Sequence, residues 1–329
     1  MNGVELNLFR FEYDLTWMAF FMDANDRFYT RYGGREDSDA ESHLSQESLV
    51  RVMRQTLKLH QTGAVQTSRY ESRAGAVRTP EDIPTMKAML AKREMKCIHC
   101  HDVKVAQLRH RQQLDRFRRD MVFTYPAPSA LGIDIDRHKQ NLVSGVRSGS
   151  PADLAGIRAG DALLSAEGQR ILTLGDLSRV LELTPAKSTL AVNIRRGESE
   201  RNTSLALSGN WRRSEDPSWR ESLHVAGPNA GLWGRNLTAD QKQAEGIPAD
   251  SLALEVTFIW GTHTRKAGVK TKDIVVALDG IRRDMDIRQL HTYSMLSKSF
   301  GDTMPIVVRR DGKEIEFTIR FPASAPEQE

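Results

Sequence analysis

Five consecutive residues, Cys97-Ile-His-Cys-His101, carry the clearest potential for chemistry in this chain. Two thiols three positions apart and followed by a histidine form the arrangement that attaches a c-type haem, through two thioether bonds and one axial nitrogen. In this interpretation Cys97 and Cys100 anchor the haem and His101 binds its iron. The chain has no other cysteines among its 329 residues.

Three other interpretations of the run stay open. The two thiols suit a dithiol redox pair, and together with both histidines they suit a metal such as zinc, the ligands then being Cys97, His99, Cys100 and His101. The cysteines could also serve no cofactor at all. A second axial ligand is not assigned: an unbroken helix would place His110 roughly 13 Å from His101, too far to share one iron.

The charge composition is close to balanced, with 47 Lys and Arg against 43 Asp and Glu, and does not predict a nucleic-acid partner. The basic excess is concentrated between Lys87 and Arg119, where it could meet haem propionates or an acidic redox partner. No apolar run approaches the roughly 18 to 20 residues of a membrane span. Residues 1–10 also lack the pattern of a signal peptide.

The N-terminal residues predict a small mixed segment. Val4–Phe9, Leu15–Met22 and Phe28–Tyr32 are aliphatic and aromatic runs typical of strands. Ser45 is expected to cap a helix that ends near His60. Its apolar face is predicted to comprise Leu49, Val50, Met53 and Leu57. So few elements make too small a core to stand alone, and a further strand and helix are expected in front of them.

A polar linker is predicted over Gln61–Thr79, followed by a helical segment. Thr79 and Pro80 form a helix start, which Pro84 is expected to delay by a turn. The helix is predicted to continue through the Cys97–His101 run to about Met121. Its apolar face is predicted to comprise Ala106, His110, Leu114, Phe117 and Met121.

The chain contains an internal repeat from Leu131 onward. The stretch Ala155–Gly168 returns 112 positions later as Ala267–Gly280. In each copy a short amphipathic helix follows, predicted over 176–183 and 286–296, and then a strand that ends in two arginines. A repeat of this length and order indicates one duplicated domain.

The repeated residues resemble the PDZ domain in its circularly permuted bacterial form. The resemblance is carried by Gly149-Ser-Pro-Ala152, Ala155-Gly156, Gly160-Asp161 and Glu167-Gly168. It implies that an extended peptide C-terminus adds to a sheet edge, while backbone N–H groups of a loop hold the terminal carboxylate.

The peptide-binding loop implied by this resemblance is Leu131-Gly132-Ile133 in the first copy. The second copy offers Gly231-Leu-Trp-Gly234, which departs from the apolar-Gly-apolar pattern. Peptide binding is therefore predicted for the first copy. The alternative is that both copies serve packing or dimerisation.

The N-terminal residues also resemble part of a known fold. Asp14–Trp17, Tyr29–Arg35 and the helix after Ser45 are similar to the back half of a thioredoxin-like domain. The complete order is similar to the bacterial thioredoxin-like and PDZ (seleno)protein family. That resemblance implies a periplasmic or otherwise extracytoplasmic protein, and a reactive cysteine or selenocysteine upstream of Met1. We therefore expect Met1 to be an internal start.

Together these features predict an α+β multidomain protein. The expected parts are a partial thioredoxin-like segment, a linker with the helical Cys97–His101 segment, a first permuted PDZ domain, a Trp-rich linker and a second permuted PDZ domain, over residues 1–63, 64–124, 125–210, 211–228 and 229–323. The predicted function is a redox or electron-transfer protein with peptide-binding modules, and no catalytic residue is assigned. The alternative is a noncatalytic PDZ scaffold with a dithiol or metal site.

Overall fold

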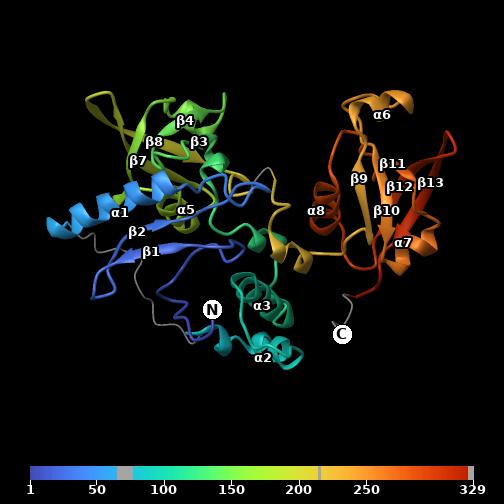
Figure 1. The fold of residues 1–329 in the computed structure, drawn as a ribbon, viewed down its shortest axis with the longest axis horizontal. Coiled ribbons are helices and arrows are strands. Elements are labelled where there is room, and N and C mark those ends of the chain that lie inside the picture. The colour runs from blue at the N-terminus through green and yellow to red at the C-terminus, as the bar shows by residue number, and fades with distance from the viewer. Residues whose placement is uncertain (65–76, 214–215, 325–329) are drawn as a thin grey trace. The chain divides into compact units, whose positions relative to one another are not determined.

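The computed structural model describes residues 1–64, 77–213 and 216–324. The chain divides into two compact units, Met1–Arg220 and Glu221–Glu329, which we call the N-terminal and C-terminal units and describe separately (Figure 1). No helix among the described residues has the length and apolar character needed to cross a membrane. Most of the predicted linker Gln61–Thr79 lies outside the described residues.

The chain begins with a short hairpin. Strands β1 (Ala19–Met22) and β2 (Phe28–Tyr32) pair in antiparallel fashion. The predicted strand Val4–Phe9 is wrong: this stretch forms turns, because the Phe9 N–H donates to the Glu5 carbonyl rather than to a neighbouring strand. The predicted strand Leu15–Met22 forms only in its second half.

Helix α1 (Gln46–Gln61) starts where predicted, with the Ser45 side chain accepting a hydrogen bond from the Ser48 N–H. Its predicted apolar face is wrong, because Met53 and Leu57 are more than half exposed. The helix packs through Ser48 and Val52 instead. The Tyr32 hydroxyl bonds to Ser48, which ties the helix to β2.

The predicted long helix is broken. It consists of a 3-10 turn, η1 (Pro80–Asp82), then α2 (Pro84–Ala91) and α3 (Cys100–Gln113). The start of α2 at Pro84, one turn after Pro80, confirms the predicted delay. The Lys96 ammonium donates to the Leu90 carbonyl at the end of α2, which stabilises the break. Because α3 ends at Gln113, Leu114 lies outside the helix and is half exposed, so the predicted apolar face does not continue.

The first copy of the repeat follows two 3-10 turns, η2 (Arg119–Val122) and η3 (Pro128–Leu131). Strands β3 and β4 pair with each other, and the remaining strands form a sheet in the order β6-β5-β7-β8. The elements are β3 (Ile133–Ile135), β4 (Val143–Val146), α4 (Pro151–Leu154), β5 (Ala162–Ala166), β6 (Gln169–Arg170), α5 (Leu174–Leu183), β7 (Ser188–Arg196) and β8 (Ser199–Leu207). The aromatic residue after β8, Trp211, packs into the core of this copy.

The second copy lies in the C-terminal unit after η4 (Glu221–Val225). It forms one five-stranded sheet in the order β13-β12-β11-β10-β9, so β9 is an edge strand. The elements are β9 (Leu232–Asn236), α6 (Ala239–Ala244), β10 (Leu254–Ile259), α7 (Thr262–Ala267), β11 (Ile274–Leu278), α8 (Ile287–Ser297), β12 (Thr303–Arg310) and β13 (Lys313–Arg320). The matching order of β5-α5-β7-β8 and β11-α8-β12-β13 confirms the predicted repeat.

Candidate functional site

The Cys97–His101 run lies at the start of α3. Cys97 is exposed before the helix, and Cys100 is the first helical residue. His101 has 46% of its side chain exposed, and its ring stacks on that of His99 with the centroids 5.5 Å apart. Ile98 turns inward and is buried. Cys97 and His101 therefore both reach solvent, whereas Cys100 is half-buried.

Asp102 fixes the geometry of this turn. Its carboxylate accepts the His99 N–H at 2.9 Å and two hydrogen bonds from the Arg93 guanidinium, at 2.7 and 2.8 Å. Burial alone would raise the pKa of Asp102, but Arg93 and the His99 N–H more than offset this and hold the pKa below its ordinary value. The backbone from His99 to Asp102 is consequently held in one conformation.

The Cys100 thiol packs against the apolar cluster of the helical segment. Burial raises its pKa, so the thiol form dominates at neutral pH. Among the described residues, no group of three or more His, Cys, Asp or Glu side chains is placed to hold a metal ion. Cys97, His99, Cys100 and His101 are therefore not assembled as a zinc site. His101 and His110 lie on the same helix, which keeps His110 away from any iron bound by His101.

The predicted peptide-binding loop lies between η3 and β3. Gly132 has a φ of +79°, a left-handed conformation that glycine adopts without strain, and its carbonyl accepts the Arg147 N–H. The flanking Leu131 and Ile133 are buried. The loop thus has a left-handed glycine between two apolar side chains that turn inward.

The second copy contains an equivalent loop one residue earlier than the sequence analysis placed it. Gly231 has a φ of +66°, its carbonyl accepts the Trp260 N–H, and it lies directly before β9 as Gly132 lies directly before β3. Its neighbours Ala230 and Leu232 are buried. The apolar-Gly-apolar pattern is therefore present as Ala230-Gly231-Leu232, and the small alanine concealed it in the sequence.

An aspartate–arginine pair is built identically in both copies. In the first, Asp161 takes two hydrogen bonds of 2.7 Å from Arg196, which also donates to the Gly156 carbonyl. Burial alone would raise the pKa of Asp161, but Arg196 and the Arg158 N–H more than offset this and lower it.

In the second copy, Asp273 takes two bonds of 2.7 Å from Arg310, which also donates to the Gly268 carbonyl. These contacts hold the sharp turn that precedes β5 and β11.

The free side of β9 faces α8. The Leu237 N–H donates to Ala253 across the sheet, and alternation along the strand then turns the backbone groups of Leu232, Gly234 and Asn236 away from β10. His291 of α8 bonds through Nε2 to the Leu232 carbonyl at 2.9 Å. Burial lowers the pKa of His291 to about 4, so the ring is neutral at pH 7 and Nε2 carries its proton. One side chain of α8 therefore occupies a backbone acceptor on the free side of β9.

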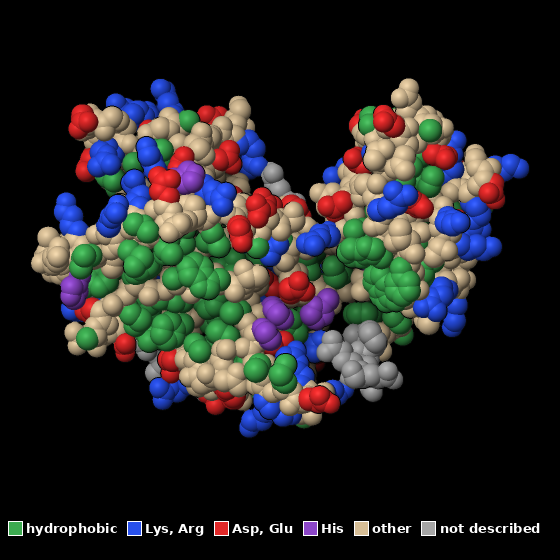
Figure 2. All heavy atoms as spheres, viewed as in Figure 1, with side chains coloured by type: hydrophobic (Ala, Val, Ile, Leu, Met, Phe, Trp, Pro, Cys, Tyr) green, Lys and Arg blue, Asp and Glu red, His purple; other side chains and the backbone are tan. Residues whose placement is uncertain are grey.

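Two exposed tryptophan rings lie beside His291, and the Phe258 ring stacks on one of them, Trp260. Trp233, Phe258 and Trp260 are 46%, 59% and 40% exposed, and both tryptophan rings lie within 6.3 Å of the His291 ring. We call these three residues the aromatic cluster; Figure 2 shows apolar side chains gathered on this unit. Sequence analysis missed the cluster and His291, although Trp233 directly follows the loop residue Leu232.

Comparison with known sequences matches residues 142–196 to the PDZ domain family. The chain is 26% identical over 180 residues to a probable periplasmic serine endoprotease DegP-like of Marinomonas sp. (strain MWYL1), covering 54% of this chain and 36% of that protein. It is 38% identical over 58 residues to the periplasmic serine endoprotease DegP of Escherichia coli (strain K12), covering 18% and 12%. The chain therefore spans about a third or less of the length of these relatives.

Similar solved structures include the HtrA3 PDZ domain bound to a phage-derived ligand (FGRWV), with 28% identity, a TM-score of 0.18, and coverage of 20% of this chain and 60% of that one. The PDZ domain of EpsC from Vibrio cholerae has 20% identity, a TM-score of 0.21, and coverage of 29% and 100%. From the family match, residues 142–196 of the first copy form a PDZ domain.

Proposed function

We propose that this protein is an extracytoplasmic peptide-binding protein, and that the second copy of the repeat receives the peptide. In this proposal both copies are circularly permuted PDZ domains. The last strand of each copy, β8 or β13, forms one edge of its sheet. The extracytoplasmic setting is supported by the periplasmic names of the DegP relatives. The single observation that carries the peptide site is the edge strand β9, which lies between a Gly231 loop and α8.

The backbone groups that a peptide end would use in the second copy are held by the protein's own side chains. The Gly231 N–H donates to the Asn229 side-chain oxygen at 2.9 Å, where a terminal carboxylate would accept it. His291 donates to the Leu232 carbonyl, where a peptide N–H would donate. Binding would exchange the Asn229 bond for a charge-assisted bond to the carboxylate and the His291 bond for a strand-pairing bond, and apolar contact with the aromatic cluster would add to the affinity.

A titration with three peptides tests this function. The probe is a synthetic eight-residue peptide ending in a free valine carboxylate, compared with its C-terminal amide and with a version whose last two backbone nitrogens are methylated. Tryptophan fluorescence of the full chain should report saturable binding of the free acid. The amide and the methylated peptide should bind at least about tenfold more weakly, because each loses charge-assisted or strand-pairing hydrogen bonds.

The binding copy is identified by surface substitutions. Trp233→Ser with Phe258→Ser should weaken binding of the free acid at least about tenfold, because both rings lose their apolar contact with the peptide. Leu154→Ser is the matched control, since Leu154 is an exposed apolar residue of the first copy. Equal binding by all three peptides would overturn strand addition. Binding that ignores the aromatic cluster would return the site to Leu131, Gly132 and Ile133.

We propose, as a second function, that Cys97 and Cys100 carry a covalent haem whose iron is bound by His101. The exposure of Cys97 and His101 supports this, because attachment requires side chains that the haem can reach. The bound group would supply one-electron transfer, with the basic Lys87–Arg119 region facing an acidic partner. The alternative is an unmodified dithiol.

The N-terminal hairpin and α1 support the proposal of a thioredoxin-like segment over residues 1–63.

Haem attachment has a direct spectroscopic test. The protein is exported with an added signal peptide in a host with active cytochrome c maturation, purified under denaturing conditions, and its reduced-minus-oxidised spectrum is recorded. A haem absorption band should remain with the polypeptide and be lost when Cys97 and Cys100 are both changed to Ser. His110→Ala is the control and should keep the band. An intact exported protein without the band would favour the dithiol.

A further inference from the structure

Helix α5 of the first copy is buried on every side. All eight residues from Leu174 to Leu181 are buried. Leu177, Val180 and Leu181 face the core of their own copy. The other side of the helix, with Gly175 and Ser178, must therefore be covered by residues from outside the copy.

That covered side corresponds to the side of α8 that faces the edge strand β9, which we call the groove side. The two helices start with equivalent caps, since Thr173 accepts from the Asp176 N–H and Asp286 accepts from the Gln289 N–H. Five residues after each cap stand Ser178 and His291. His291 bonds to the free edge of β9 and therefore lies on the groove side of α8. Ser178, at the equivalent position, lies on the groove side of α5.

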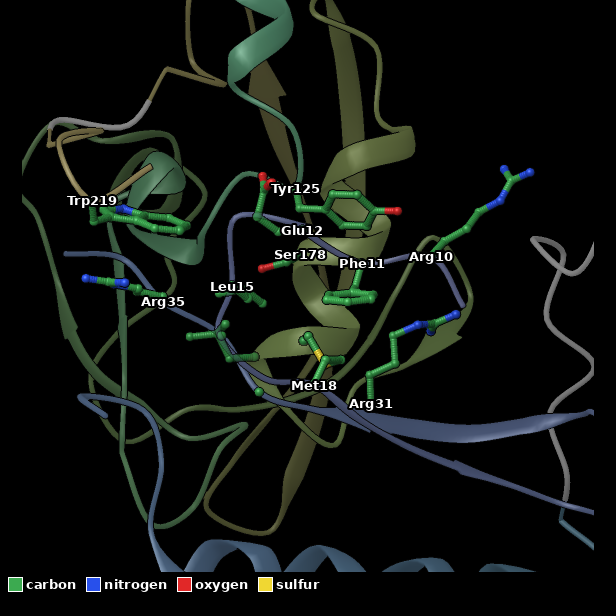
Figure 3. A pocket seen from close by; sticks show the side chains of 14 residues that line it. Arg10, Phe11, Glu12, Leu15, Met18, Arg31, Arg35, Tyr125, Ser178 and Trp219 are labelled. Carbon is green, nitrogen blue, oxygen red and sulfur yellow. The ribbon is translucent and has the colours of Figure 1, made fainter. Parts of the chain in front are cut away.

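The groove side of α5 carries only a small remaining cavity, of about 20 Å³, shown in Figure 3. This is room for roughly one water molecule and not for a peptide strand. The picture places Ser178 beside Phe11 and Leu15, with Trp219 and Arg35 on one side and Arg10 and Arg31 on the other.

An N-terminal segment is bonded to α5 through its backbone. The Arg31 N–H donates to Asp176 at 3.0 Å, and the Thr173 hydroxyl donates to the Arg31 carbonyl. Thr30 adds a side-chain bond of 2.6 Å to the same carboxylate. These bonds hold the end of β2 against the start of the helix.

The same segment continues across the groove side to the loop before β3. A Cβ on Gly34 would stand 2.1 Å from a methyl of Leu174, so a larger residue here would force Leu174 or the segment to move. The Glu36 carboxylate then accepts the Ser129 N–H at 3.2 Å, in the turn that ends at Gly132. The segment from Arg31 to Glu36 therefore runs from the helix to the loop, ending in a carboxylate.

We infer that residues 31–36 act as a built-in ligand that fills the peptide groove of the first copy. The first copy then holds the N-terminal hairpin in place through this segment. Its groove residues Gly175 and Ser178 are small, which leaves room for the segment. A peptide can enter this groove only when the segment leaves it. This inference goes beyond peptide binding by the second copy and does not depend on it.

A peptide supplied in trans tests the inference on the full chain. The probe is a fluorescein-labelled synthetic peptide of residues 28–38, followed by fluorescence anisotropy. Wild-type protein should show no saturable binding, because its own segment occupies the groove. Gly34→Val should bind the probe saturably, because the added methyls displace the segment from the groove. Ser38→Val, at an exposed position two residues beyond Glu36, is the matched control and should behave as wild type.

Two further variants make the result decisive. Adding Ser178→Trp to Gly34→Val should abolish binding by filling the groove; binding that survives it would lie elsewhere and overturn the inference. Thr30→Val is the milder variant should Gly34→Val fold poorly. It should speed amide exchange in residues 31–36 about tenfold and admit the probe, whereas Thr62→Val, which loses only exposed bonds, should do neither. Equal binding by wild type, or no binding by a folded Thr30→Val protein with accelerated exchange, would refute the built-in ligand.

Discussion

Replacing Arg220 by Met is expected to lower the free energy of unfolding of the N-terminal unit by about 3–5 kcal/mol. Arg220, Glu12 and Lys104 are all at least 95% buried, and both cations bond to the Glu12 carboxylate. Thr124 donates to the same carboxylate at 2.8 Å. Removing Arg220 takes one cationic partner from Glu12. It also takes one from Asp14, whose carboxylate lies 3.8 Å from the guanidinium. Urea unfolding followed by hydrogen exchange, which resolves the two units, measures the loss.

The control for Arg220 is the exposed pair Arg118–Asp120, whose side chains are 68% and 65% exposed. Arg118→Met should lower the free energy of unfolding far less than Arg220→Met, because solvent screens the exposed pair. A similar small loss for Arg220→Met would show that the buried network contributes little.

The pH dependence of the Arg220 effect has a defined sign. Burial would raise the pKa of Glu12, but the charges of Arg220 and Lys104 more than offset this and lower it below its ordinary value of 4.5. The stabilisation is thus complete above pH 4.5 and is lost as the pH falls through the folded pKa. The difference in unfolding free energy between wild type and Arg220→Met should therefore narrow below pH 4.5. A difference that widened there would contradict the assignment.

Changing either copy of the repeated aspartate should destabilise only its own unit. Asp273→Asn removes the charge that receives two bonds from Arg310 and one from the Lys270 N–H, and Asp161→Asn does the same in the first copy. Both carboxylates are at most 2% exposed, so each change should cost about 2–3 kcal/mol. Hydrogen exchange should show faster opening of the C-terminal unit for Asp273→Asn and of the N-terminal unit for Asp161→Asn.

Glu314→Gln is the control for Asp273, because Glu314 also receives two bonds from one arginine, Arg282, but both side chains are about half exposed. Solvent screens that pair, and its loss should cost less than about 1 kcal/mol. Faster opening of both units in a single aspartate variant would mean that the units are not independently stabilised.

Local patterns in the sequence were sufficient for several features. The repeat was visible because Asp161, Arg196 and Gly156 recur as Asp273, Arg310 and Gly268, and their equivalent contacts follow from that spacing. The starts of α1 and α2 were predictable because caps and helix-starting prolines act within one turn. Such signals predict a structure that is decided by neighbours in the chain.

Other predictions failed because distant residues decide them. The predicted strand Val4–Phe9 forms turns, and the predicted face of α1 through Met53 and Leu57 points outward, since both depend on which element packs against the segment. The second loop was missed because an alanine in the sequence does not by itself indicate a buried loop residue. The structure shows that Ala230 is buried directly before Gly231 and β9.

The sequence by itself determined a repeated order: a turn with glycine and aspartate, an apolar strand, a short helix and a strand that ends in two arginines. The tertiary structure alone decided which residues cover α5 in the first copy and which lie beside α8 in the second. In the first copy, Gly34 meets Leu174 from 140 positions away and brings the Arg31–Glu36 segment onto α5. In the second, His291 bonds to the Leu232 carbonyl on the free side of β9, next to two exposed tryptophan rings. Local spacing carries no signal of either arrangement, because each is set by contacts between residues far apart in the chain.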